Sequence, residues 1–76
     1  MKDLKTNPGV RVYSKAELAS LYTPSLSPNS SRQTLIRWIN RNKQLKKKLD
    51  AIGYDKRRHF FLSREVELIY KYLGMP

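Results

Sequence analysis

The chain has 76 residues, with 16 Lys and Arg against 6 Asp and Glu, which gives a formal net charge of +10 and a pI near 10.2. A chain this short forms one small core and no deep catalytic cleft, which argues against a large enzyme. Hydrophobic residues make up 39% of the sequence, enough to fold, and the lack of cysteine excludes a disulfide framework and a Cys-type zinc site. The sequence contains no apolar run of signal-peptide or membrane-span length, so we expect a cytoplasmic protein.

The positive charge is concentrated in the middle of the chain. Residues 32–58 hold ten Lys and Arg against two Asp, a net charge of +8. Residues 1–31 carry a net charge of +2, and the charges of residues 59–76 cancel. A concentrated positive field of this kind is typical of a protein that binds nucleic acid.

The sequence predicts a short arm followed by one domain. Residues 1–9 are polar and end in a Pro-Gly pair, which predicts a flexible N-terminal arm. The single domain then occupies residues 10–76. Val10 and Val12 alternate with more polar neighbours, which indicates a short strand at its start.

Two helices are expected in the first half of the domain. Ser14 and Glu17 have the spacing of a capping box, in which each side chain satisfies a free backbone amide, and they predict a helix over residues 15–22. A Ser-Pro pair then marks a second start, because proline at the first helical position loses no hydrogen bond. The second helix is expected over residues 28–41.

Two further helices follow. A third helix is expected after a break near Asn42, with an apolar stripe at i, i+4 and i+7, and Gly53 is placed to end it. Residues 54–58 read as a charged turn and residues 59–62 as a strand. The last helix is expected after a Ser63 cap. Its core stripe consists of Val66, Ile69, Tyr70 and Leu73, and it ends at Gly74.

These elements are the parts of a winged helix-turn-helix, a mainly α fold of four short helices with a small β-hairpin wing. The second helix carries apolar residues on one side and no acidic residue on the other. Gln and Asn pair with adenine, Arg with guanine, and Ser or Thr with base edges or phosphates, so this outer face suits the major groove. The expected base-reading residues are Ser30, Gln33, Thr34, Arg37, Asn40 and Arg41.

Basic residues outside this face are expected to contact phosphates. Arg32 lies about 140° from Arg37 around the helix, toward the core, and is expected to touch a phosphate or an acidic neighbour. The Lys46-Lys47-Lys48 run spreads over about 200°, so at most two of its lysines face one backbone. Three cations at the expected hairpin tip resemble a wing. The full set is Arg32, Lys43, Lys46, Lys47, Lys56, Arg57 and Arg58, and a solvated basic surface is the alternative for the lysine run and the turn.

A set of residues that covers most of the chain carries a resemblance to known proteins. These residues are Ser14-Lys15-Ala16-Glu17-Leu18-Ala19, Leu21-Tyr22, Pro24, Ser27-Pro28, Leu35, Arg37-Trp38-Ile39, Leu45, Leu49, Gly53-Tyr54, Arg58, Phe61, Val66, Ile69, Leu73-Gly74 and Pro76. From about residue 10 onward the chain resembles a family of small Bacteroidetes proteins known as a domain of unknown function. More distantly, it is similar to the DNA-binding head of MerR-type regulators and phage excisionases. The resemblance implies a bacterial DNA-binding protein, at the nucleoid when bound.

Catalytic and metal chemistry have little support in the sequence. The only group of acidic and histidine residues close together in the sequence is Asp50, Asp55 and His59. We interpret them as surface groups that balance the charge of a basic segment and not as a metal or catalytic site. We therefore expect no enzyme activity, no cofactor, no metal and no small-molecule substrate.

Two apolar residues of the last helix leave a second function open. Leu68 and Tyr72 lie opposite the core stripe, so either the helix is buried on two sides or it offers an apolar surface to a second copy or another protein. A non-enzymatic protein that binds double-stranded DNA is the first hypothesis, as a small transcriptional regulator or an accessory factor of a mobile element. A protein-interaction adaptor and an RNA-binding protein are the alternatives.

Overall fold

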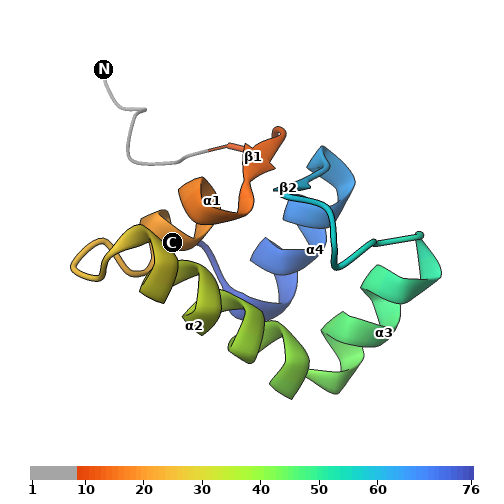
Figure 1. The fold of residues 1–76 in the computed structure, drawn as a ribbon. Coiled ribbons are helices and arrows are strands. Elements are labelled where there is room, and N and C mark those ends of the chain that lie inside the picture. Colours follow the sequence, from red (N-terminus) through yellow and green to blue (C-terminus); the bar gives the residue numbers. More distant parts are fainter. Residues whose placement is uncertain (1–8) are drawn as a thin grey trace.

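The computed structural model describes residues 9–76, and the arm expected over residues 1–9 lies outside this range except for Gly9. The elements are, in chain order (Figure 1), β1 (Tyr13–Ser14), α1 (Lys15–Tyr22), α2 (Pro28–Arg41), α3 (Lys43–Ala51), β2 (Phe60–Phe61) and α4 (Ser63–Leu73). The fold is mainly helical, with four helices and a two-stranded antiparallel sheet, and it is compatible with a winged-helix arrangement. The predicted fold class is confirmed.

Side-chain caps set the starts of the first three helices close to the predicted positions. The Ser14 hydroxyl accepts a hydrogen bond from the backbone N–H of Glu17 at 3.0 Å, and Ser27 caps α2 in the same way. The Asn42 side chain caps α3 through the N–H of Leu45. The capping box expected at α1 is only half formed, because the Glu17 carboxylate pairs with a neighbouring arginine.

The start of α4 differs from the prediction by one residue. Ser63 is the first helical residue and not the cap, and Leu62 occupies the cap position. Leu62 has no side-chain acceptor, but its backbone N–H donates to the Glu65 carboxylate at 2.8 Å. At the other end, Gly74 adopts a φ of +89°, which a residue with a Cβ rarely adopts, and this ends the helix where predicted.

The sheet joins the start of the domain to the segment just before the last helix. Tyr13 pairs with Phe61 on the buried face, and Ser14 pairs with Phe60 on the exposed face. The strand predicted over residues 10–13 therefore starts later than expected, at Tyr13. Because three helices separate β1 from β2, the basic segment is a turn between α3 and β2 and not the tip of a local hairpin.

The core lies where the helices meet. Helix α1 packs on α2, and α3 packs on both α2 and α4. The buried hydrophobic residues are Tyr13, Leu18, Ala19, Leu35, Ile39, Leu45, Leu49, Phe61, Val66, Ile69 and Tyr70. Trp38 anchors α1 to α2, with its ring edge-to-face against Tyr22 at a centroid distance of 6.0 Å. Within residues 9–76 the longest helix has 14 residues, and none has the length and apolarity that crossing a bilayer requires.

Candidate nucleic-acid interface

The outer face of α2 is exposed as the sequence predicts. Five of its six expected base-reading residues are exposed; Thr34 is half-buried, and its hydroxyl donates to the Ser30 carbonyl at 2.8 Å. Among residues 9–76, no hydrogen bond or ion pair engages the remaining long polar side chains of the face, namely Gln33, Arg37, Asn40 and Arg41. These side chains therefore present free donors and acceptors to an incoming ligand.

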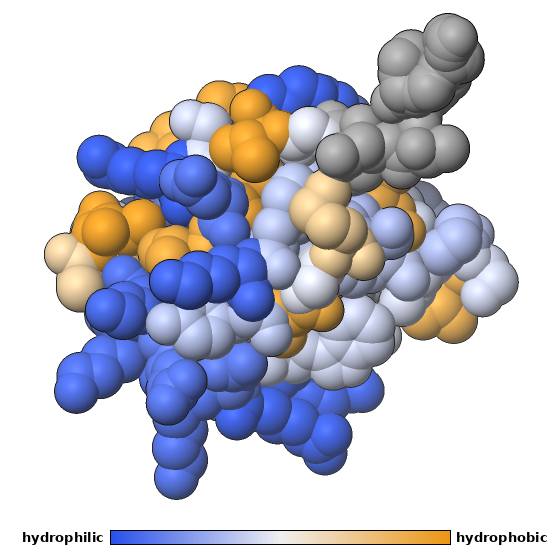
Figure 2. Space-filling model, turned by 180° about the vertical axis from the view of Figure 1, so that it is seen from behind, coloured by the Kyte–Doolittle hydropathy of each residue, from blue (hydrophilic) through white to orange (hydrophobic). Residues whose placement is uncertain are grey.

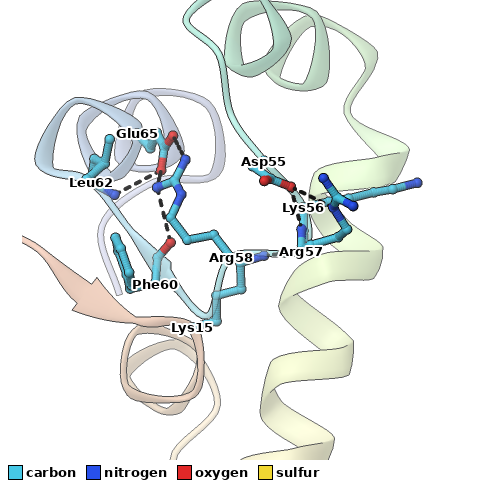
Figure 3. Close-up of polar contacts among 8 residues, drawn as sticks. All are labelled: Lys15, Asp55, Lys56, Arg57, Arg58, Phe60, Leu62 and Glu65. Carbon is cyan, nitrogen blue, oxygen red and sulfur yellow. Dashed lines mark hydrogen bonds and ion pairs between the residues drawn. The ribbon is translucent and has the colours of Figure 1, made fainter.

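The turn between α3 and β2 presents Lys56 and Arg57 to solvent. Asp55 accepts a hydrogen bond from the Arg57 backbone N–H at 2.9 Å, and a weaker one from its guanidinium at 3.5 Å. The backbone bond is the main reason that the pKa of Asp55 is lowered. The Arg57 side chain remains 88% exposed, so the turn is held in shape while its cations stay accessible. In Figure 3 the Lys56 side chain extends toward α2.

Arg58 departs from the predicted wing. Its guanidinium points away from Lys56 and into the protein, where it forms a two-pronged ion pair with Glu65 at 3.0 and 2.9 Å (Figure 3). The Glu65 side chain is fully buried and that of Arg58 is 19% exposed. The bond to Glu65 is the main cause of the raised pKa of Arg58. Arg58 therefore ties the turn to α4, and its guanidinium is engaged by Glu65 and is not directed outward toward a phosphate, contrary to the prediction from the sequence.

Lys15 also lines the candidate site, although the sequence does not predict it there. It begins α1 directly after a cap, a position normally exposed to solvent, yet it is only 5% exposed. Its Nζ donates to the Lys56 carbonyl at 2.8 Å and lies 4.9 Å from the centre of the Tyr54 ring. Burial is the main cause of its lowered pKa. Since sequence neighbours give no sign of this burial, no local pattern identifies the residue.

Two adjoining clefts run between α2 and the basic turn, which is the segment of residues 54–58 between α3 and β2. The wide cleft, of about 430 Å³, lies between α2, α3 and the turn; the basic cleft, of about 290 Å³, lies between α2, the start of α1 and the turn. Five residues line both clefts, so the two form one groove: Ile39, Asn40, Tyr54, Lys56 and Arg57. The wide cleft also has Lys46, Asp50 and Asp55 on its wall, and the basic cleft has Arg32.

The groove brings together only part of the predicted site. Arg32, Asn40, Lys46, Lys56 and Arg57 line it, although they come from three segments of the chain. Arg32 is exposed, and its guanidinium donates to the Asn29 side-chain amide at 2.7 Å and not to an acidic neighbour.

Other predicted residues lie elsewhere. Arg41 and Lys43 line a separate open hollow beside Trp38, where α2 ends and α3 begins. Lys47 is exposed on α3 and lines none of these clefts. From behind, hydrophilic side chains project from the lower part of the molecule, around the end of α2 and α3 (Figure 2).

Leu68 and Tyr72 of the last helix are less exposed than an apolar surface for a partner protein requires. Leu68 and Tyr72 are both half-buried and pack against the core. In the described part of the chain, no group of three or more His, Asp or Glu side chains could hold a metal ion.

Comparison with known proteins places the chain in a family without assigning it an activity. No curated protein and no solved structure matches it. Residues 9–76 match the family described as a domain of unknown function, DUF4248. This match begins at the first residue that the structure describes and includes both strands and all four helices. The chain therefore belongs to the DUF4248 family.

Proposed function

We propose that this protein is a non-enzymatic double-stranded DNA-binding protein that places α2 in the major groove and contacts phosphates through α3 and the basic turn. Its role would be that of a small transcriptional regulator or an accessory factor of a mobile element. The resemblance of its sequence to MerR-type and excisionase heads supports the same proposal.

The observation that carries the proposal is the combination of one helix face and one groove. Helix α2 has no acidic residue, and Gln33, Arg37 and Asn40 are exposed on it. Lys56 and Arg57 lie across the groove from this helix. A helix of this kind fits the major groove, and flanking cations fit the phosphate backbone that borders it.

The charge distribution predicts how strongly salt weakens binding. Residues 32–58 carry a net charge of +8, part of which is neutralised internally because Arg58 is paired with Glu65. We expect about four to six phosphate contacts and a slope of log affinity against log salt of roughly −4 to −5. The measurement is fluorescence anisotropy on random duplex DNA at several salt concentrations. Binding that ignores salt, or no binding at low salt, would remove the proposal.

A second experiment separates base reading from phosphate contact. After selection of a preferred site, Arg37→Ala or Gln33→Ala should reduce the preference for that site by about 1–3 kcal/mol. Lys47→Ala is the control, because this exposed lysine lies on α3 and outside the helix face; it should weaken all sequences equally and by less. Equal losses for all three variants would show that α2 does not read bases.

The same assays decide between DNA and the alternatives. Duplex RNA has a deep and narrow major groove that a helix does not enter, so tighter binding to RNA than to DNA of the same sequence would replace the proposal with RNA binding. The adaptor alternative depends on Leu68 and Tyr72, and its support is weaker because both side chains pack against the core.

A further inference from the structure

The basic cleft has an unusual lining. Six of its residues are cationic or imidazole side chains, and no Asp or Glu lines it: Lys15, Arg32, Lys56, Arg57, Arg58 and His59. Like charges gathered around a cleft repel one another, and an anion bound between them offsets this repulsion. The cleft therefore has the charge of an anion site.

Internal partners neutralise only some of these cations. Arg58 is matched by the buried carboxylate of Glu65. Arg57 has a long contact of 3.5 Å with Asp55, in a pair that is largely exposed. Arg32 bonds to a neutral amide. Within residues 9–76, no carboxylate pairs with Lys15, Arg32 or Lys56 at ion-pair distance, so the cleft keeps an excess of positive charge.

Lys15 is the strongest indication of a ligand. A buried ammonium is costly unless its charge is compensated. Its ammonium group has three N–H donors. Among the described residues, it contacts the Lys56 carbonyl and the Tyr54 and Phe61 rings, whose centres lie 4.9 and 5.6 Å from Nζ. Burial lowers its pKa first and the charge of Arg58 lowers it further, and the opposite effect of the Glu65 and Asp55 carboxylates does not offset them. An anion in the cleft would supply the missing counter-charge.

We infer that the basic cleft binds a phosphate group, with Lys15, Arg32 and Lys56 as its cationic ligands. The cleft of about 290 Å³ has room for a phosphate and some of its water. A phosphate also has enough acceptor oxygens to serve several donors that converge from different segments. The group belongs either to a DNA backbone or to a free phosphorylated molecule. The first case deepens the proposed function and rests on it; the second is independent of it.

The test is a titration of the full chain with inorganic phosphate, followed by amide NMR shifts, against chloride at equal ionic strength. We expect saturable shifts confined to the 54–59 turn, the start of α1 and the residues around Arg32 in α2. Lys15→Met should weaken phosphate binding at least tenfold. Lys48→Met removes the same charge from an exposed position outside the clefts, and should change binding less than twofold. Equal shifts with chloride, or equal losses in both variants, would overturn the inference.

A second variant covers the case in which Lys15→Met does not fold. Arg32→Gln removes a charge from the cleft at an exposed position and leaves the core untouched. It should weaken phosphate binding at least threefold with an unchanged circular dichroism spectrum. Phosphate binding that survives this change intact would overturn the inference.

Duplex DNA binding by the same variants identifies the source of the phosphate. If the site holds a backbone phosphate, Lys15→Met or Arg32→Gln lowers the salt slope by about one. Loss of phosphate binding with unchanged DNA binding would assign the cleft to a free phosphorylated molecule. DNA binding without a saturable phosphate site would overturn only this inference. A saturable phosphate site without DNA binding would overturn only the proposed function.

Discussion

Removal of Arg58 is expected to destabilise the fold more than removal of any exposed cation. The Glu65 carboxylate is fully buried and accepts two bonds from Arg58, at 3.0 and 2.9 Å, and one from the Leu62 N–H at 2.8 Å. In Arg58→Met the carboxylate keeps only the last of these bonds, so a buried charge is left without its counter-ion.

The size of the effect follows from this geometry. Breaking a buried ion pair from one side costs about 3–5 kcal/mol. The Arg58 side chain is still 19% exposed, so we expect the lower end, about 3 kcal/mol. For a domain of this size, that corresponds to a fall in Tm of about 12–24 °C. Total stability for such a length is about 4–11 kcal/mol, so the variant should be marginal.

Thermal and urea denaturation followed by circular dichroism provide the measurement. Arg57→Met is the matched control, because its side chain is 88% exposed, and it should change stability by no more than about 0.5 kcal/mol. Adding Glu65→Met to Arg58→Met removes the unpaired charge and should restore part of the loss. A loss below about 1 kcal/mol in Arg58→Met would refute the assignment of this pair as the link between the turn and α4.

Three further predictions concern stability. Burial raises the pKa of Tyr22 and Tyr54 from 10 to about 12. The stability that these two phenols contribute is therefore complete below pH 10 and falls as the pH rises toward 12. In alkaline thermal melts, the Tm of Tyr54→Phe should fall less with pH than the Tm of the wild type. Leu68→Lys combined with Tyr72→Lys should cost about 2 kcal/mol or more, since both side chains pack against the core; a calorimetric melt that matches wild type, together with a change in sedimentation mass, would favour the exposed-interface interpretation instead. Gly53→Ala should lower the free energy of unfolding by about 1–2 kcal/mol in urea denaturation, because Gly53 has a φ of +84°, which a residue with a Cβ rarely adopts. The space around its Cβ position is open, so the cost comes from backbone strain and not from a clash. Gly53→Asn should cost less.

The sequence alone determined the helices and one face of the site. Caps and stop signals act within a few residues, so Ser14, Ser27 and Gly74 mark helix ends in the folded protein as they do in the sequence. The outer face of α2 is equally local, because the side that is not apolar must face away from the core. The exposed Gln33 and Arg37 are where the sequence placed them.

Only the tertiary structure decided which cations belong to the groove and which to the core. Arg57 and Arg58 are neighbours in a basic run, yet one is exposed and the other pairs with a carboxylate seven residues away along the chain. Lys15 lies 41 residues from the carbonyl that it binds. A local sequence pattern records side-chain chemistry and periodicity, but the burial and partners of a charge depend on contacts between distant segments. For this reason the groove and the buried lysine follow only from the packing of α1, α2 and the turn, and the pairing of Arg58 only from the position of α4.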